Sequence, residues 1–195
     1  QPAAETAAAL LKEYTNEVRT DPMGSVSAGF RPGSPLVLLD AHIDEIGLVV
    51  SYIGEKGFIK AASVGGVDRR LLIAQEVVIL SETPVEGVIA SRPPHLLTAE
   101  EEKKVPKVED LWIDTGFSKQ ELEKRVCLGD RILLKADFHE LLSGRVCSKA
   151  LDDRAGVAAV LKALELLKGE ELSCGLAVSF TSQEELGCLG AKTSA

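Results

Sequence analysis

Runs of apolar residues divide the chain into two segments with α/β character, separated by a long stretch of a different kind. Residues 35–39 are continuously apolar, which is typical of a strand that is covered on both faces. Apolar residues recur at helical spacing over 157–167, and alternation over 176–180 then predicts another strand. We also expect a helix over residues 3–18, which are rich in alanine with apolar side chains along one side.

The stretch between these segments consists of short strand-like runs separated by turn signals. Many short strands with little helix favour a small β-barrel or sandwich. A capping-box pattern at residues 118–121 predicts one short helix, and the charged residues 98–107 predict an exposed loop. One α/β domain is therefore expected to be interrupted by an inserted β domain. The expected strands are residues 48–53, 58–62, 71–80, 85–90 and 130–135.

Composition narrows the functional classes. Hydrophobic residues make up 45% of the chain and aromatic residues only 4%, so the core must be mainly aliphatic, which suits strands packed against helices. A net charge of −8 argues against nucleic acid or an anionic membrane as the main partner. No apolar run reaches the length of a membrane span, and the start lacks the features of a signal peptide.

The cysteines favour a reducing, cytoplasmic setting over a secreted one. The four cysteines form no C-x-x-C pair, so a zinc ribbon or a redox motif is not expected. Cys127 and Cys174 fall within predicted strands, where a free cysteine packs as a small hydrophobic residue.

Residues whose side chains can bind a metal or take part in catalysis gather in three short clusters. The first, at 41–47, follows the apolar run at 35–39, and functional residues of open α/β sheets collect at the carboxyl ends of strands. His42 and Asp44 are two residues apart and share one side of a strand, so Asp44 could orient the imidazole of a metal-bound His42. Taken alone, this short pattern more often represents a buried histidine beside an exposed turn carboxylate.

The other two clusters carry paired carboxylates. Asp152 and Asp153 precede a predicted helix, where a carboxylate commonly caps the helix or, in two-metal hydrolases, bridges two ions. Glu184 and Glu185 follow the predicted strand at 176–180, either as an ordinary helix-capping region or as one metal ligand and one general base. Each cluster alone is a weak signal, but all three in this order and context indicate a hydrolytic metal site.

Five motifs carry a wider resemblance: Ala-His-Ile-Asp-Glu-Ile-Gly at 41–47, Arg-Pro-Pro-His-Leu at 92–96, Leu-Trp-Ile-Asp-Thr-Gly at 111–116, Ser-Lys-Ala-Leu-Asp-Asp-Arg-Ala-Gly at 148–156 and Gln-Glu-Glu-Leu-Gly at 183–187. Together they resemble the tetrahedral aminopeptidases, co-catalytic metallopeptidases that include glutamyl and deblocking aminopeptidases and proteins labelled as cellulases or FrvX-like. The resemblance covers essentially the whole chain in the family's order.

The resemblance implies an α/β fold, with a mixed sheet that carries helices on both faces and an inserted small β-barrel that makes dimer contacts. We place the first part of the catalytic domain at residues 1–46, the inserted barrel at 47–142 and the second part of the catalytic domain at 143–195. All three clusters then belong to the catalytic domain.

The resemblance also implies a role for each matching residue. His42 would be a terminal ligand of one metal, with Asp44 behind it as a catalytic support, and Asp152 would bridge both metals. Glu184 would be the general base, and Glu185 a terminal ligand of the second metal.

The implied activity is the removal of N-terminal residues from peptides by a two-metal-activated water. The implied cofactors are two divalent metal ions, zinc or cobalt first and manganese next. The expected partners are peptide substrates and further copies of the chain, as a dimer and a hollow tetrahedral dodecamer. The peptide bond between Asp152 and Asp153 is implied to be cis.

Family members continue with an aspartate on a later strand and a histidine near their end, whereas this sequence ends at Ala195. His42, Asp152 and Glu185 alone leave each site one ligand short of the three that catalytic zinc usually takes. We therefore expect either a longer protein or a non-catalytic fragment, with an open strand edge and exposed apolar surface in the residues given. The rival functions are a glycoside hydrolase of the endoglucanase type, a non-catalytic assembly protein, and a related carboxypeptidase or deacylase.

Overall fold

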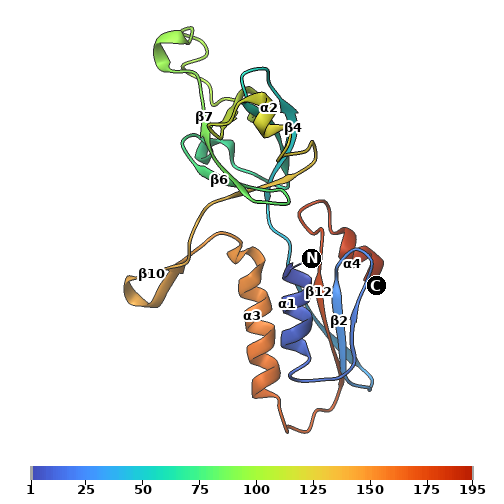
Figure 1. Ribbon diagram of the computed structural model, residues 1–195. Helices are drawn as coiled ribbons and strands as arrows, with labels where there is room; N and C mark the ends of the chain where they lie inside the picture. The colour runs from blue at the N-terminus through green and yellow to red at the C-terminus, as the bar shows by residue number, and fades with distance from the viewer. Residues whose placement is uncertain (1, 195) are drawn as a thin grey trace. The chain divides into compact units, whose positions relative to one another are not determined.

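The computed structural model describes residues 2–194, which divide into two compact units (Figure 1). The α/β unit comprises the described residues up to Glu45 and those from His139 onward, and the barrel unit runs from Ile46 to Phe138. Two separate stretches of chain thus build the first unit, and one continuous stretch builds the second. An α/β fold with an inserted barrel confirms the predicted fold class.

The α/β unit is built on a mixed four-stranded sheet with the order β1-β2-β12-β3. The pairs β1–β2 and β2–β12 are antiparallel, whereas β12 and β3 are parallel. The parallel register places Thr181 opposite His42, so the carboxyl ends of these two strands lie side by side. The strands are β1 (Val18–Thr20), β2 (Val26–Arg31), β3 (Leu36–His42) and β12 (Gly175–Thr181).

Helices lie on both faces of this sheet. Leu176, Val178 and Phe180 of β12 alternate into the core beneath the two longer helices, and Phe180 is fully buried. The other face, which includes Ser179, lines a hollow of about 700 Å³ beside the short third helix. None of the helices among the described residues is long and apolar enough to cross a membrane. The helices of this unit are α1 (Pro2–Leu11), α3 (Leu151–Leu166) and α4 (Leu189–Ser194).

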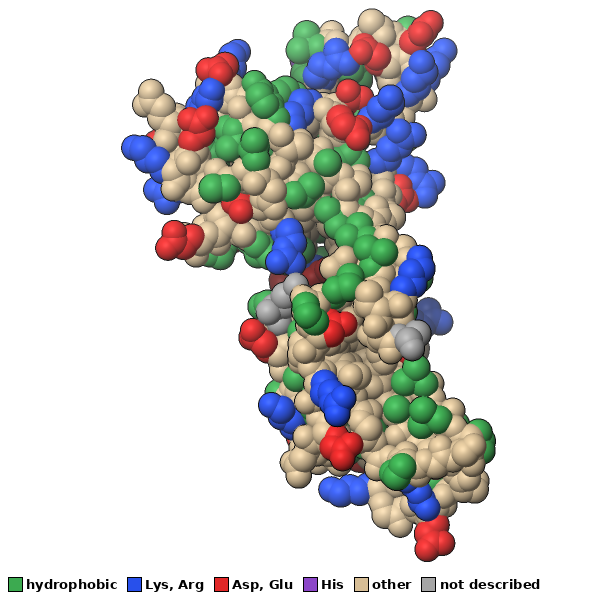
Figure 2. All heavy atoms as spheres, turned by 90° about the vertical axis from the view of Figure 1, so that its right-hand side faces the viewer, with side chains coloured by type: hydrophobic (Ala, Val, Ile, Leu, Met, Phe, Trp, Pro, Cys, Tyr) green, Lys and Arg blue, Asp and Glu red, His purple; other side chains and the backbone are tan. Residues whose placement is uncertain are grey.

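Strand β3 forms one edge of the described sheet, and its first half is open to solvent. Leu36 and Leu38 expose 62% and 58% of their surface. Figure 2 shows further apolar side chains lying exposed among charged ones on the face that it presents. An apolar, unpaired strand edge is a surface that natural proteins normally cover.

A two-stranded hairpin precedes α3 and projects from the α/β unit (Figure 1). It pairs β10 (His139–Leu141) with β11 (Arg145–Cys147) in antiparallel register. Its turn contains Leu142, of which 91% is exposed. The sequence patterns did not predict this hairpin, because its strands are only three residues long and have no buried face.

The barrel unit is a closed barrel with the strand order β4-β5-β8-β7-β6-β9. Its core is aliphatic, and Ile59, Ile79 and Ile132 are fully buried. Ser118 begins the short helix α2 (Lys119–Leu122) with the predicted capping box: its side chain accepts from the backbone N–H of Glu121, whose carboxylate accepts in return. The strands are β4 (Gly47–Ile53), β5 (Ile59–Val64), β6 (Glu76–Leu80), β7 (Val85–Ala90), β8 (Trp112–Asp114) and β9 (Arg131–Leu134).

The predicted first helix is too long. The prediction covered residues 3–18, but the helix ends at Leu11, and Val18 begins β1. Val18 pairs with Ala28 of β2, so the sheet ladder at this point overrides the local helical pattern.

The strand predicted at 71–80 is also too long, because it begins only at Glu76. Arg69–Leu71 form a 3-10 turn, capped by the side chain of Asp68, which accepts from a backbone N–H, and a further turn at residues 73 and 74 precedes β6. Cys127 and Cys174 were predicted to lie in strands and instead lie in the connections before β9 and β12. At these positions the turn-forming residues, and not the short apolar runs, determine where the strand begins.

Candidate metal centre

The three clusters meet at the carboxyl ends of β3 and β12. His42 is the last residue of β3, and its neighbour across the parallel ladder, Thr181, is the last residue of β12. Glu184 and Glu185 lie in the turn that follows β12, and Asp152 lies at the start of α3. A topology in which two parallel strands end together thus brings distant parts of the chain to one edge of the sheet.

His42 occupies the middle of this group, with only 10% of its side chain exposed. Its Nε2 lies 2.9 Å from Oδ1 of Asp152 and 3.8 Å from Oε2 of Glu184. Burial disfavours the imidazolium, but the hydrogen bond to Asp152 and the charges of Asp44 and Glu184 outweigh it, so the pKa of His42 is raised. Nδ1 of His42 is buried and has no hydrogen-bond partner among residues 2–194.

Asp44 fastens the turn that carries the two glutamates. One of its carboxylate oxygens accepts from the backbone N–H of Glu184 at 3.1 Å, and the other from that of Glu185 at 3.2 Å. Oδ1 of Asp44 is 3.6 Å from Nδ1 of His42, just beyond hydrogen-bond distance. The sequence predicted Asp44 as a support for the imidazole and missed these backbone contacts, for which no local pattern exists.

Asp152 and Asp153 take different roles. Oδ1 of Asp153 accepts from the backbone N–H of Gly156 at 3.0 Å, which caps the regular part of α3. Asp152 instead faces His42, with 87% of its side chain exposed. The peptide bond between the two aspartates is cis, as the family resemblance implied. The helix cap and the site-facing carboxylate, which the sequence left as alternatives, are thus supplied by different members of the pair.

Glu184 and Glu185 complete the group. Donor atoms of His42, Glu184 and Glu185 all lie within 4.8 Å of one another. The thiol of Cys188 donates to Oε1 of Glu184 at 3.4 Å. Within the described chain, no lysine or arginine forms an ion pair with Asp152 or with either glutamate. Carboxylates gathered in this way repel one another, and a bound cation relieves the repulsion.

These residues fit a divalent metal ion. Two atoms bound to one ion at about 2.0–2.2 Å lie at most about 4.4 Å apart, and Nε2 of His42 and Oδ1 of Asp152, which are 2.9 Å apart, meet this limit. One imidazole with several carboxylates is a donor set that suits zinc, cobalt and manganese. The absence of a neutralising lysine or arginine among the described residues is consistent with a metal cation.

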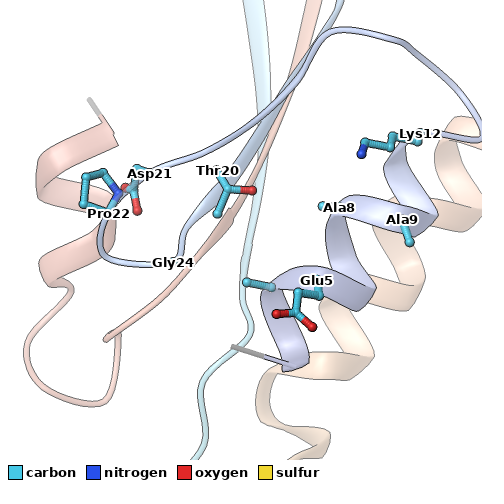
Figure 3. A pocket seen from close by; sticks show the side chains of 9 residues that line it. Glu5, Ala8, Ala9, Lys12, Thr20, Asp21, Pro22 and Gly24 are labelled. Atoms are coloured by element: carbon cyan, nitrogen blue, oxygen red, sulfur yellow. The ribbon is translucent and has the colours of Figure 1, made fainter.

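A separate hollow of the α/β unit lies between α1 and the turn that joins β1 to β2 (Figure 3). Its volume is about 540 Å³, and Glu5, Lys12 and Asp21 are its charged lining residues. Oδ1 of Asp21 accepts from the backbone N–H of Ser25, so this carboxylate is engaged in the turn. The other lining residues are small or apolar, and the donor cluster described above lies elsewhere in the unit.

Comparison with known proteins identifies a family and several relatives of this chain. Residues 24–195 match the family described as M42 glutamyl aminopeptidase. A putative aminopeptidase of Acetivibrio thermocellus is 36% identical over 186 residues, which cover 95% of this chain and 53% of that protein.

Solved structures agree with the sequence match. A TET aminopeptidase from the marine sediment archaeon Thaumarchaeota archaeon SCGC AB-539-E09 superposes with a TM-score of 0.91 at 34% identity, covering 97% of this chain and 55% of that one. The TET1 peptidase of Pyrococcus horikoshii, described as able to assemble into a tetrahedron or a large octahedral shell, gives a TM-score of 0.85 at 36% identity over 97% and 58% of the two chains. The chain spans about half the length of the relatives it matches.

The matched region contains every residue of the candidate centre, from His42 to Glu185. A match over this much of the chain confirms the resemblance inferred from the five motifs. The family is one of metallopeptidases, which implies divalent metal ions and agrees with the donor atoms gathered around His42. The chain belongs to the M42 glutamyl aminopeptidase family.

Proposed function

We propose that the natural protein carrying this sequence is an aminopeptidase that uses two divalent metal ions to remove N-terminal residues from peptides. The observation that carries this proposal is the meeting of one buried imidazole with three carboxylates that have no lysine or arginine partner within residues 2–194. Membership of the M42 family supports the same reaction class. In this proposal His42 and Asp152 would hold one ion, and Asp152 and Glu185 would hold the other.

Two bound divalent ions would polarise the scissile carbonyl and acidify the attacking water. Glu184 would accept a proton from the attacking water on its carboxylate and deliver it to the leaving amine. Its side chain is 41% exposed and lies 3.8 Å from Nε2 of His42, so it reaches both the donor atoms and an approaching peptide. Asp44 contributes by fixing the backbone of Glu184, which limits where this carboxylate can move.

In this proposal the described residues supply one imidazole, from His42, and two carboxylates, from Asp152 and Glu185, to two ions, and the family resemblance implies one further aspartate and one further histidine. The relatives are about twice as long as this chain, which leaves room for those ligands outside the present sequence. Zinc or cobalt suits the mixed donor set best, and manganese is the next candidate.

We further propose that copies of the protein associate, through dimers that involve the barrel unit and in larger closed assemblies. The description of the related Pyrococcus horikoshii TET1 peptidase as a tetrahedral or octahedral assembly supports this. A cytoplasmic location is proposed because all four cysteines are free, as expected in a reducing compartment. The net charge of −8 remains an argument against nucleic acid as a partner.

The test is hydrolysis by the purified natural protein of one peptide series with a free or an acetylated N-terminus. We expect release of N-terminal residues only from the free series, loss of activity with a chelator, and recovery on adding zinc, cobalt or manganese. Chelator-resistant cleavage of a β-glucan would instead support the glycoside hydrolase. Failure to bind any of the three metals would support a non-catalytic assembly protein.

A further inference from the structure

Glu45, directly after Asp44, binds two cationic side chains from a distant segment. Oε2 of Glu45 accepts from Nζ of Lys149 at 2.5 Å, and Oε1 accepts from Nη2 of Arg154 at 3.0 Å. Only 16% of its side chain is exposed. Among the other lysine and arginine ion pairs of the described residues, every carboxylate is at least 38% exposed. Glu45 is thus the least exposed carboxylate of this group, and its two contacts are correspondingly less weakened by solvent.

The segment that Glu45 holds is the one that presents Asp152. Lys149 lies three residues before Asp152, and Arg154 lies two residues after it. The backbone between them is not helical: Ala150 has a φ of 58°, and Asp152 has φ −85° and ψ 106°. Because the side chain of Asp152 is 87% exposed, packing does not fix it either. The contacts from Glu45 on both sides of Asp152 therefore constrain where its carboxylate lies.

We propose that Glu45 is a positioning residue of the metal centre, which acts through Lys149 and Arg154 to hold Asp152 opposite His42. The inference rests on the proposed function and adds to it a residue that contacts none of the candidate ligands. Asp44 and Glu45, the two successive carboxylates after β3, then each hold a segment that carries residues of the metal centre. Asp44 fixes the turn that carries the glutamates, and Glu45 fixes the segment that carries the bridging aspartate.

The expected consequence is a change in metal affinity. Residues that support metal ligands typically change affinity or activity by about 10- to 100-fold when they are replaced. Glu45→Gln keeps the shape but turns an amide N–H₂ toward a cationic donor, so we expect metal affinity to fall by at least about tenfold. Glu45→Asp keeps the charge but is one methylene shorter and cannot reach both cations, so we expect a smaller fall in the same direction.

The experiment titrates the metal-free natural protein with Co²⁺ and follows the visible absorption of the bound ion. Circular dichroism melting of the metal-free protein reports separately whether each variant is folded. Glu55→Gln is the matched control, because Glu55 pairs with Lys119 at the same 2.5 Å in the barrel unit. We expect the Co²⁺ spectrum and affinity of Glu55→Gln to equal those of the parent, and both to change in Glu45→Gln while its metal-free fold is retained.

A double-mutant cycle then distinguishes positioning from a general loss of stability. In a protein that carries both Lys149→Met and Arg154→Met, Glu45 has lost its partners, so adding Glu45→Gln should alter Co²⁺ affinity by less than about twofold. If the metal-free Glu45→Gln protein does not fold, Glu45→Asp and Lys149→Met are compared with the parent in the same titration.

Two results would overturn the inference: a Co²⁺ affinity of Glu45→Gln within about twofold of the parent, or an undiminished effect of Glu45→Gln in the Lys149→Met, Arg154→Met background. A parent protein that binds no Co²⁺ would contradict the proposed function itself, and the two failures are therefore distinguishable.

Discussion

Replacing Asp44 with asparagine should loosen the turn that carries both glutamates. The carboxylate of Asp44 accepts two backbone N–H groups, from Glu184 and Glu185, and 23% of its side chain is exposed. Hydrogen bonds to a charged acceptor contribute about 1.5–3 kcal/mol each. Asparagine keeps one acceptor oxygen and turns an N–H₂ group toward the other backbone N–H. Because the site is partly exposed, we take the low end for the lost bond and a smaller loss for the weakened one, which gives about 2 kcal/mol.

The assay is urea unfolding of the metal-free natural protein, followed by far-ultraviolet circular dichroism. Asp114→Asn is the matched control, because Asp114 accepts a single backbone N–H, from Gly116, at an exposed turn of the barrel unit. We expect the control to change the free energy of unfolding by less than about 0.5 kcal/mol. An Asp44→Asn protein that unfolds within about 0.5 kcal/mol of the parent, and binds Co²⁺ equally well, would refute the assignment of Asp44 to this turn.

Three further predictions concern the rest of the chain. Phe180→Ala removes a fully buried side chain from the core of the α/β unit. It should lower the free energy of unfolding, measured by urea denaturation, by about 3–5 kcal/mol. A loss below about 1 kcal/mol would contradict that packing. Gly57 and Gly116 both have positive φ, but only at Gly57 would an added Cβ overlap a neighbouring atom, the carbonyl oxygen of Phe117. Gly57→Ala should therefore lower the melting temperature clearly more than Gly116→Ala. Equal losses of melting temperature would argue against the close contact. The pKa of Glu101 is lowered from 4.5 to about 2, because its carboxylate accepts first from the backbone N–H of Thr98 and then from the guanidinium of Arg92. The stabilisation of this loop should therefore be present above about pH 4.5 and be lost as the pH falls through about 2. An NMR titration midpoint of Glu101 near 4.5 would contradict this.

The sequence predicted the fold where a pattern extends over many residues. The helical spacing over 157–167 and the alternation over 176–180 correspond to α3 and β12, and in both the larger apolar side chains face the core of the α/β unit, which imposes the period. The pattern failed where an element has no such face or where a partner overrides it. The hairpin of β10 and β11 is exposed throughout, and Val18 leaves the predicted helix to pair with β2.

The candidate centre was predictable as a set of residues and not as a set of contacts. His42 and Asp152 could be proposed because strand ends and helix starts are visible in the sequence, and the structure places their side chains 2.9 Å apart. The contacts of Asp44 with the glutamate turn, and of Glu45 with Lys149 and Arg154, join positions more than 100 residues apart. No local spacing encodes such contacts, because the Asp44 contacts arise only when β3 and β12 pair in parallel, and the Glu45 contacts only when α3 packs against β3.

The central claim is that Glu184 is the base of a two-metal peptidase centre, and not itself a required metal ligand. The most direct measurement compares Glu184→Gln with the parent natural protein, by counting bound metal ions and by the rate of N-terminal residue release from a free peptide. We expect metal content and affinity within about twofold of the parent, and a rate at least about a hundredfold lower. A variant that turns over peptide at the parental rate, or that loses its metal ions, would contradict this assignment.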